Sequence, residues 1–383
     1  MNKEETKHWI YPAIAGVIVS ACWVLSGCGN AAKTKGASET FPLGKIDIQA
    51  LPGGACTAPA YIAKEKGFFE SEGLDVTLVS GDFETNKLGL ASGKYPVANG
   101  DFQFFPSANQ GLDIKLIAGL HQGCIQVLVP PGSLIKKAED LAGKRIGVDE
   151  IGGSPMAVTS ILLANHGIDP TTGVTWLPFP RDQLPTVADK GNEVDAVALW
   201  DPFGPLAVKR GYTVICDIGI DPLFAGRYCC FLFASGKQLR ENPERIKAVL
   251  RAYHKASEWI AQNPEETARI VTEKGYVPSE DPAFIAELLI GYRYHAKHDA
   301  SVKHQTKEDA RYFAHELKKA GFLPKDLNEE LFVENLYFEV LGDEEDKTNI
   351  HGQLEKTWDD TLHSQTKEIV VKNSHEIMEV KKH

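Results

Sequence analysis

The sequence predicts an α/β fold with two lobes, each an open sheet flanked by helices. In residues 53–76 a Gly-rich turn, a helix and a strand follow one another, directly after a short strand at 46–48. Residues 150–155 repeat this turn, with glycines, a serine N-cap and a proline at the first helical position. The length of 383 residues exceeds what one hydrophobic core usually serves. Two β-α-β lobes are therefore expected.

The first β-α-β unit shows how local chemistry sets these elements. Pro59 suits the first turn of a helix because it has no N–H to lose there. Gly67 ends that helix, since glycine tolerates left-handed backbone geometry. Residues 74–79 alternate apolar and polar side chains in the manner of a strand. In such a unit, the Gly-rich turn faces whatever binds at the carboxyl end of the first strand.

The remaining patterns assign the rest of the first lobe. Strands are expected at 96–99, 114–120 and 125–129, and a short helix is expected at 85–91. The pair Pro130 and Pro131 interrupts the last of these strands, because proline cannot donate to a strand ladder. We therefore expect the chain to leave the first lobe there, so that lobe 1 spans residues 45–130.

The second lobe is expected over residues 131–220, after which the chain returns to the first. Its strands are expected at 145–148, 175–177, 194–199 and 212–216, with a helix at 156–166. Beyond Asn242 the spacing of apolar residues becomes helical, with Asn-Pro-Glu helix starts. Residues 221–342 therefore carry the return to lobe 1 and the C-terminal helices. The polar stretch 343–383 is expected to be a poorly ordered or loosely docked tail.

Composition argues against two classes of function. The net charge is −11 and no basic stripe is present, which argues against a nucleic-acid partner. The acidity is otherwise explained by solubility alone. Neither a G-x-S-x-G nucleophile elbow nor a G-x-x-x-x-G-K-S/T phosphate loop is present in the sequence. The chain therefore cannot hydrolyse ATP by the usual P-loop.

The run AYIAKEKGFFESEGLDVTLVSG at residues 60–81 closely resembles the first β-α-β unit of periplasmic-type solute-binding proteins. The subfamily is the one named for nitrate, sulfonate, taurine and thiamine-pyrimidine binding, and further matches lie at 140–148 and 193–197. The resemblance implies a periplasmic-binding-protein-like fold of type II, with a ligand cleft between the lobes. It also implies a small-molecule solute, a partner ABC permease with a separate ATPase, a monomer, no cofactor and no enzymatic activity.

The amino terminus resembles that of a bacterial lipoprotein. Residues 10–25 are apolar apart from Ser20, which is too short for a membrane span of about 20 residues but suits a signal h-region. Leu25-Ser26-Gly27-Cys28 has the pattern of a lipoprotein signal-peptidase site. We expect a signal peptide at 1–27, a lipid on Cys28, a tether at 28–44 and an extracytoplasmic protein anchored to the cell membrane. The mixed charge of the first nine residues departs from the pattern, so an uncleaved anchor is the alternative.

Cleft residues are expected at strand ends, because open α/β sheets bind ligands at the carboxyl edges of their strands. Two lobes that face each other can close on a small molecule by hinge motion. From the first lobe the candidates are Cys56, Thr57, Asp82, Phe83, Asp101, Phe102, His121 and Cys124. From the second lobe they are Gly153, Ser154, Trp200, Asp201 and Phe203, and the returning strand adds Arg227 and Tyr228.

The candidate side chains favour a ligand with a positive charge. The carboxylates are those of Asp82, Asp101 and Asp201, and they stand next to the rings of Phe83, Phe102 and Trp200. This combination suits a heteroaromatic or amine-bearing solute through ion pairing, stacking and cation–π contact. The turn at 152–154 points the other way, because backbone N–H groups at a helix N-terminus can hold an anion. That turn is equally explained as a tight strand-to-helix connection. A small organic anion therefore stays open as an alternative.

Five cysteines remain in the folded part once Cys22 leaves with the signal and Cys28 takes the lipid. They are Cys56, Cys124, Cys216, Cys229 and Cys230. Those at strand ends are candidates for a soft metal or a disulfide, together with His121, and the alternative is that they are buried small hydrophobes. Since adjacent strand residues point to opposite faces, only one of Cys229 and Cys230 is expected to face inward. Cys216 is expected in the core.

Two other functions remain open. Thiamine-pyrimidine synthases of this fold are similar to these binders and carry a cysteine-rich iron-binding run, of which residues 228–231 resemble a shortened version. This chain departs from that run by having two cysteines, and a cytosolic enzyme would not need its export signal. A sensor that presents its ligand to a receptor is the other possibility, and a neighbouring permease gene would favour import.

Overall fold

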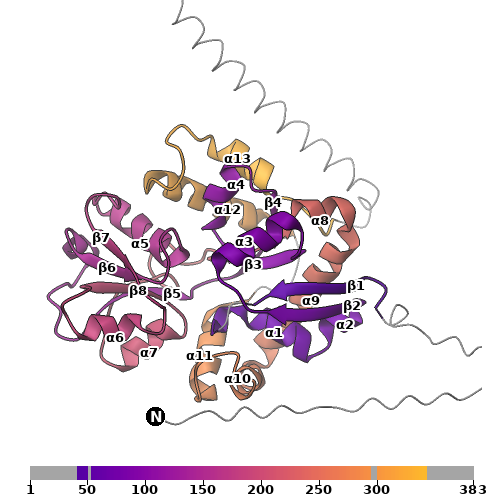
Figure 1. The fold of residues 1–383 in the computed structure, drawn as a ribbon, viewed down its shortest axis with the longest axis horizontal. Helices are drawn as coiled ribbons and strands as arrows, with labels where there is room; N and C mark the ends of the chain where they lie inside the picture. Colours follow the sequence, from indigo (N-terminus) through magenta and orange to yellow (C-terminus); the bar gives the residue numbers. More distant parts are fainter. Residues whose placement is uncertain (1–40, 51–52, 295–299, 343–383) are drawn as a thin grey trace, which may run out of the picture. The chain divides into compact units, whose positions relative to one another are not determined.

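Three β-sheets carry the fold, and helices pack on their faces (Figure 1). The computed structural model describes residues 41–50, 53–294 and 300–342. The described strands are β1 (Gly44–Gln49), β2 (Leu74–Val79), β3 (Val97–Asp101), β4 (Ile114–His121), β5 (Ile125–Val129), β6 (Arg145–Val148), β7 (Thr175–Pro178), β8 (Ala196–Trp200), β9 (Thr213–Asp217) and β10 (Cys230–Ser235). β1 and β2 pair in parallel, β10 lies antiparallel between β3 and β4, and the five-stranded sheet has the order β7-β6-β8-β5-β9.

Helices connect most of these strands. The described helices are α1 (Ala58–Glu65), α2 (Phe68–Ser71), α3 (Phe83–Ser92), α4 (Phe104–Asn109), α5 (Ser154–Asn165), α6 (Leu184–Asp189), α7 (Phe203–Lys209), α8 (Gly236–Glu241), α9 (Pro243–Gln262), α10 (Pro264–Glu273), α11 (Pro282–Gly291), α12 (Ala300–Lys319) and α13 (Glu329–Leu336), with short 3-10 helices at Ala55–Thr57 and Ala138–Leu141. Within the described ranges, no helix has both the length and the apolar character that crossing a bilayer requires.

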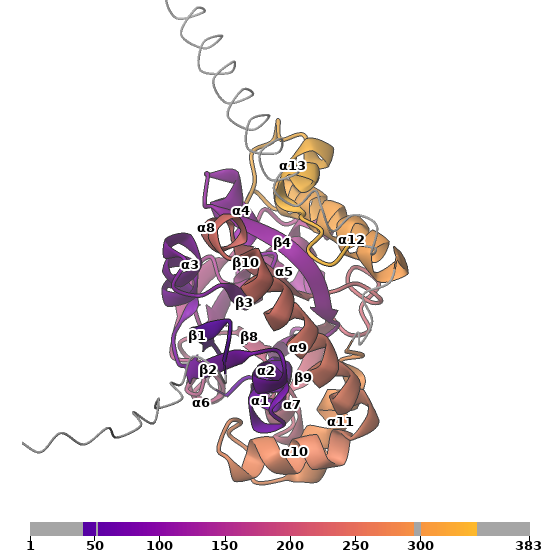
Figure 2. The same cartoon turned by 90° about the vertical axis from the view of Figure 1, so that its right-hand side faces the viewer.

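The first β-α-β unit forms as its sequence predicts. Pro59 lies in the first turn of α1, and Gly67 takes a φ of +69° between α1 and α2. Leu74 and Val76 of β2 are buried, whereas the alternate residue Thr77 is exposed. Helix α9 packs against α1 and α2, as Figure 2 shows, and the ring of Tyr253 on α9 meets Phe69 edge-on at 6.1 Å. Apolar burial therefore fixes the C-terminal helices on this unit.

The five-stranded sheet has helices on both faces, with α5 on one side and α6 and α7 on the other (Figure 1). β6 pairs in parallel with β7 and β8, so the carboxyl ends of these three strands lie at one edge. β5 pairs antiparallel with β8 and β9. The expectation that residues 125–129 belong to the first lobe is therefore wrong, since the backbone of β5 completes the second sheet. The chain crosses between sheets before β5, not at Pro130.

The α/β class and the predicted helix at 156–166 are confirmed, and α5 covers most of that range. The expected signal peptide at 1–27, the lipid site Cys28 and the tail at 343–383 lie outside the described residues, as does most of the tether. The chain leaves the second sheet after β9 and enters the smaller sheet at β10. Within the described residues, two chain crossings, one before β5 and one before β10, thus connect the five-stranded sheet to the three-stranded sheet.

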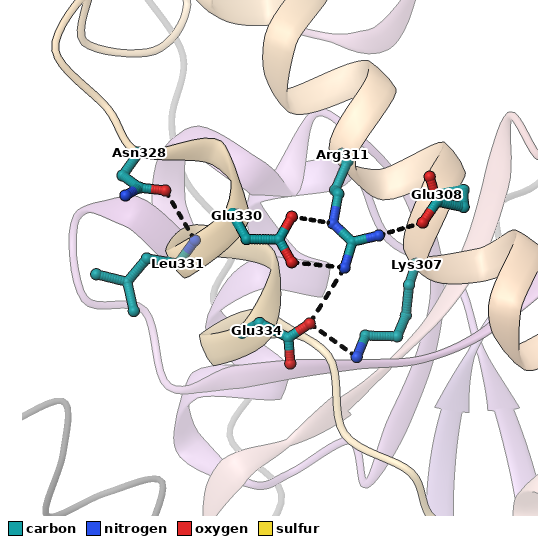
Figure 3. Close-up of polar contacts among 7 residues, drawn as sticks. All are labelled: Lys307, Glu308, Arg311, Asn328, Glu330, Leu331 and Glu334. Atoms are coloured by element: carbon teal, nitrogen blue, oxygen red, sulfur yellow. Dashed lines mark hydrogen bonds and ion pairs between the residues drawn. The ribbon is translucent and has the colours of Figure 1, made fainter.

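Charged side chains join α12 to α13, as Figure 3 shows. Arg311 on α12 places its Nε 2.5 Å from Glu330 and its Nη2 3.2 Å from Glu334, and it also pairs with Glu308. Lys307 adds a 2.8 Å contact to Glu334. The guanidinium thus pairs with carboxylates on both helices, which is the kind of network that contributes more than an isolated surface pair.

Replacing Arg311 with alanine is expected to lower the free energy of unfolding by about 1 kcal/mol, because its pairs with Glu308, Glu330 and Glu334 are lost together. Thermal unfolding at low and high salt measures the effect, which should shrink when the charges are screened. As a control, Arg269→Ala breaks one 2.9 Å pair with Glu273 on a single helix and should cost about 0.3–0.5 kcal/mol. This interpretation would be contradicted if Arg311→Ala lowered the free energy of unfolding no more than the control does, or if its effect did not change with salt concentration.

Candidate functional site

A cavity of about 590 Å³ opens where the strands of the sheets end. Its lining includes the segments that follow β2, β6 and β7, the last residues of β3 and β8, and the first residue of β10. Cys56, from the 3-10 helix after β1, completes the first lobe's contribution. Small-molecule sites commonly have volumes of about 300–1,000 Å³ and lie at the carboxyl ends of strands in open α/β sheets. The cavity therefore has the size and the place of a ligand site.

The structure brings together part of the predicted site. The sequence-predicted residues that line the cavity are Cys56, Asp82, Phe83, Asp101, Gly153, Ser154, Trp200 and Phe203. The predicted residues that lie outside this lining are Thr57, Phe102, His121, Cys124, Asp201, Arg227 and Tyr228. Both lobes are represented in the first group, so the strand-end rule leads to the sheet edges at which this cavity lies.

Side-chain alternation explains two of the residues that lie elsewhere. Phe102 follows Asp101, which faces the cavity, and its ring stacks on Phe313 at 4.4 Å in the interior. Asp201 follows Trp200 in the same way and is buried outside the lining. Its burial, reinforced by the neighbouring Cys56, raises the pKa of Asp201 to about 7. In both cases, the residue that precedes the buried one lines the cavity.

Other contacts hold the remaining candidates away from the cavity. The hydroxyl of Thr57 donates to the carbonyl oxygen of Gly54 at 2.7 Å. The guanidinium of Arg227 lies 3.8 Å from the ring centre of Tyr312, beside a separate surface hollow. Tyr228 is buried, and its backbone N–H donates to Asp309 at 2.9 Å. His121 and Cys124 lie in a buried group of side chains that is described below.

The sequence interpretation missed part of the lining. The missed residues are Gly81, Asn86, Asn99, Gly100, Gln103, Asp149, Glu150, Arg181, Asp182 and Cys230. Asp149 and Glu150 come directly after β6, and Arg181 and Asp182 follow shortly after β7. The signal that could have found them is the same strand-end rule, applied to charged residues behind every parallel strand.

Carboxylates outnumber cations in the cavity. Arg181 is the cationic lining residue among those described, and its Nη2 lies 2.9 Å from Asp149. Asp82 caps α3, and hydrogen bonds from the hydroxyl and the backbone N–H of Thr85 lower its pKa. Burial raises the pKa of Glu150, and the neighbouring carboxylates raise it further. Because Asp149 neutralises Arg181, the remaining carboxylates make the cavity electronegative.

Asp101 and Ser154 join the lobes across the cavity. The hydroxyl of Ser154, at the start of α5, donates to the carboxyl group of Asp101, at the end of β3. The second carboxyl oxygen of Asp101 accepts the backbone N–H of Gln103 at 2.8 Å. Burial, followed by the charge of Cys230, raises the pKa of Asp101 well above its usual range. Burial thus disfavours the charged form of Asp101, whereas the hydrogen bonds that it accepts from Ser154 and Gln103 favour that form.

Aromatic side chains supply the apolar part of the lining. Trp200 ends β8 and is 6% exposed, and Phe203 begins α7 immediately beyond it. Phe83 begins α3 on the first lobe, where its ring packs against Phe104 at 4.9 Å. The guanidinium of Arg181 lies 5.8 Å from the ring centre of Trp200. The cavity thus offers ring faces from both lobes together with carboxylates.

A second group of functional side chains lies next to the cavity. His121, Cys124, Cys229 and Cys230 are buried, and each offers one ligand atom within 4.8 Å of the others. The Sγ of Cys124 lies 3.5 Å from that of Cys229 and 3.8 Å from that of Cys230. Only Cys230 of the adjacent pair lines the cavity, yet both cysteines join this group, because Cys229 precedes β10 and the register of β10 with β4 shifts after Cys230. Cys216 is buried on β9, as expected.

A ligand cavity at the strand ends of two α/β sheets defines the class of two-lobed binding proteins. The chain belongs to the NMT1/THI5-like family, whose model matches residues 56–267. Among relatives, the protein named as binding protein YtlA of Bacillus subtilis (strain 168) is 24% identical over 267 residues, covering 66% of this chain and 76% of that protein. The nitrate/nitrite binding protein NrtA of Nostoc sp. (strain PCC 7120) is 24% identical over 250 residues, covering 57% of this chain and 55% of that protein.

Solved structures show the same fold. The alkanesulfonate-binding protein SsuA of Xanthomonas axonopodis pv. citri, bound to MOPS, matches with a TM-score of 0.61 at 18% identity, covering 77% of this chain and 98% of that one. A Candida albicans gene product with the generic periplasmic binding protein fold matches with a TM-score of 0.64 at 14% identity, covering 78% and 99%. The predicted periplasmic-binding-protein-like fold is therefore confirmed. YtlA, NrtA and SsuA are named as binding proteins.

Proposed function

We propose that this chain is an extracytoplasmic solute-binding lipoprotein that captures a small molecule and delivers it to an ABC importer. Family membership and the cavity between two α/β sheets support capture, since closure can couple to a ligand that contacts both lobes. The periplasmic nitrate-binding protein NrtA of Synechocystis PCC 6803, a structural neighbour, has the corresponding location in its name. A lipid on Cys28 would anchor the chain, and a separate permease and ATPase would receive and drive the solute.

The proposed ligand is a heteroaromatic or other ring-bearing amine that is cationic at neutral pH. The observation that carries this proposal is the pairing of Arg181 with Asp149 at 2.9 Å, which removes the free positive charge that an anion would need. Asp82, Glu150 and Asp182 remain in the lining to attract a cation. Trp200 and Phe203 supply the rings that favour stacking and cation–π contact.

The alternative ligand is a small organic anion. Relatives and neighbours whose names include nitrate or alkanesulfonate support it, as does the N-terminus of α5, where Gly153 and Ser154 line the cavity. An anion would have to draw Arg181 away from Asp149 or bind among carboxylates. For that reason the electrostatics of this chain favour the amine.

Benzylamine and benzenesulfonate, which share a ring and differ in charge, test the choice by calorimetry on the full-length chain in detergent. We expect benzylamine to bind at least tenfold more tightly, because opposite charge and a ring face act together. Asp149→Asn should reduce this preference by releasing Arg181. Glu241→Gln, which removes a carboxylate on α8 outside the cavity, should leave the preference unchanged. Tighter binding of benzenesulfonate by the unaltered chain would overturn the amine proposal in favour of the anion.

A further inference from the structure

The buried cluster lies where the chain crosses between the sheets. His121 ends β4 and Cys124 directly precedes β5, so the first crossing passes through Gln122 and Gly123. Cys229 and Cys230 lie at the end of the second crossing, where β10 begins. The crossings are hydrogen-bonded to each other, because the backbone N–H of Cys229 donates to the carbonyl oxygen of His121 at 3.1 Å. The four side chains therefore connect both points at which the lobes are joined covalently.

The distances within the cluster match a tetrahedral metal site. A zinc–sulfur bond of about 2.3 Å places two sulfurs of a regular tetrahedron about 3.8 Å apart. The Sγ of Cys124 lies 3.5 Å from that of Cys229 and 3.8 Å from that of Cys230. Two sulfurs that are merely in van der Waals contact would also be this far apart. A metal site requires in addition that four ligand atoms lie together, and these four lie within 4.8 Å of one another.

Unsatisfied chemistry at the cluster points to a ligand. His121 is fully buried, and within the described residues its Nε2 has no hydrogen-bond partner, whereas Nδ1 lies 3.1 Å from the carbonyl oxygen of Gln122. An unpaired buried nitrogen is destabilising, and metal-bound histidines commonly donate their second ring N–H to a carbonyl. Cys124 has a φ of +95°, a region that non-glycine residues rarely adopt and that clusters at functional sites. Both features belong to the same group of four buried side chains.

We propose that His121, Cys124, Cys229 and Cys230 bind one zinc ion in a closed, four-ligand site that fastens the two crossings together. Three thiolates and one imidazole form a common structural ligand set, and such a set leaves no open position for a reacting water. The site is therefore structural, and it forms the inner wall of the cavity, since Cys230 also lines the cavity. Cys56, which also lines the cavity and interacts with Cys124 and Cys230, lies on the ligand side of this site.

Zinc and cobalt binding to the full-length chain in detergent tests the site. The chain is first reduced and stripped with a chelator, then incubated with zinc or with Co²⁺ and separated from free metal. We expect one zinc per chain and, with Co²⁺, the visible and thiolate charge-transfer absorption of tetrahedral cobalt. Cys229→Ser should lose at least tenfold in zinc affinity. Cys216→Ser, a matched change at a buried cysteine on β9, should retain both metals.

Several outcomes would overturn the site. The first is a reduced chain that takes up neither zinc nor cobalt. The second is a cobalt spectrum of the unaltered chain without thiolate bands. Both measurements use the unaltered chain, so they decide the question even if the variants fail to fold. Equal zinc retention by Cys229→Ser and Cys216→Ser would mark the metal as adventitious. Benzylamine titration of the zinc-free and zinc-loaded chain separates this site from the proposed ligand. If the chain binds benzylamine but not zinc, the proposed metal site is wrong and the proposed amine ligand stands. If it binds zinc but not benzylamine, the proposed ligand is wrong and the metal site stands.

Discussion

Trp200→Ala is expected to weaken benzylamine binding by about 10- to 100-fold, corresponding to about 1.4–2.8 kcal/mol. Trp200 ends β8 at the cavity and presents the largest aromatic surface in its lining. The loss combines the apolar contact with the ring's attraction for a cation, and both are strong where water is excluded. Calorimetry of the variant against the unaltered chain measures the change directly.

The control for this prediction is Trp176→Ala, on β7 of the same sheet. Trp176 is partly buried and donates its indole N–H to the carbonyl oxygen of Pro170 at 2.8 Å, and it does not line the cavity. Its replacement should lower stability and leave affinity unchanged at a temperature where both variants are folded. Equal affinity of the Trp200 variant and the unaltered chain, with the fold retained by circular dichroism, would place the ligand elsewhere.

Local signals were sufficient to predict most of the fold. Pro59, Gly67 and the alternating strand at 74–79 each act within a few residues, so their effect can be inferred without the tertiary structure. The repeated turn at 150–155 predicted α5 for the same reason. The place of β5 could not be predicted in this way. Its partners β8 and β9 lie far along the chain, and the residues of an apolar strand do not indicate which sheet it joins.

The site was predictable to the level of the sheet edge but not of the side chain. Whether Asp101 or its neighbour Phe102 faces the cavity depends on strand register, which long-range pairing fixes. Arg181 and Asp149, which pair between the segments after β6 and β7, were both missed, because their approach depends on how these two strands lie side by side. Convergence of Cys124 with Cys229 depends on a positive φ and on an irregular register, neither of which the sequence displays.

Phe102→Ala is expected to lower the free energy of unfolding by about 3–5 kcal/mol while leaving ligand affinity unchanged in the folded protein. Phe102 is fully buried, and its ring stacks on Phe313 of α12 at 4.4 Å with an interplanar angle of 20°. Truncation removes this contact and leaves a cavity that the surrounding sheet and helix cannot fully close. Chemical denaturation measures the loss, and benzylamine titration at low denaturant measures the affinity.

Phe83→Ala provides the opposite case, because Phe83 lines the cavity and is only partly buried. It should cost less stability than Phe102→Ala, because Phe83 buries less apolar surface on folding, and it should weaken benzylamine binding, because a ring face at the ligand is lost. The two phenylalanines come from the first lobe and were expected from the sequence to serve the same site. If Phe102→Ala reduced affinity more than Phe83→Ala, then the interior face of β3, and not the cavity, would be the ligand site.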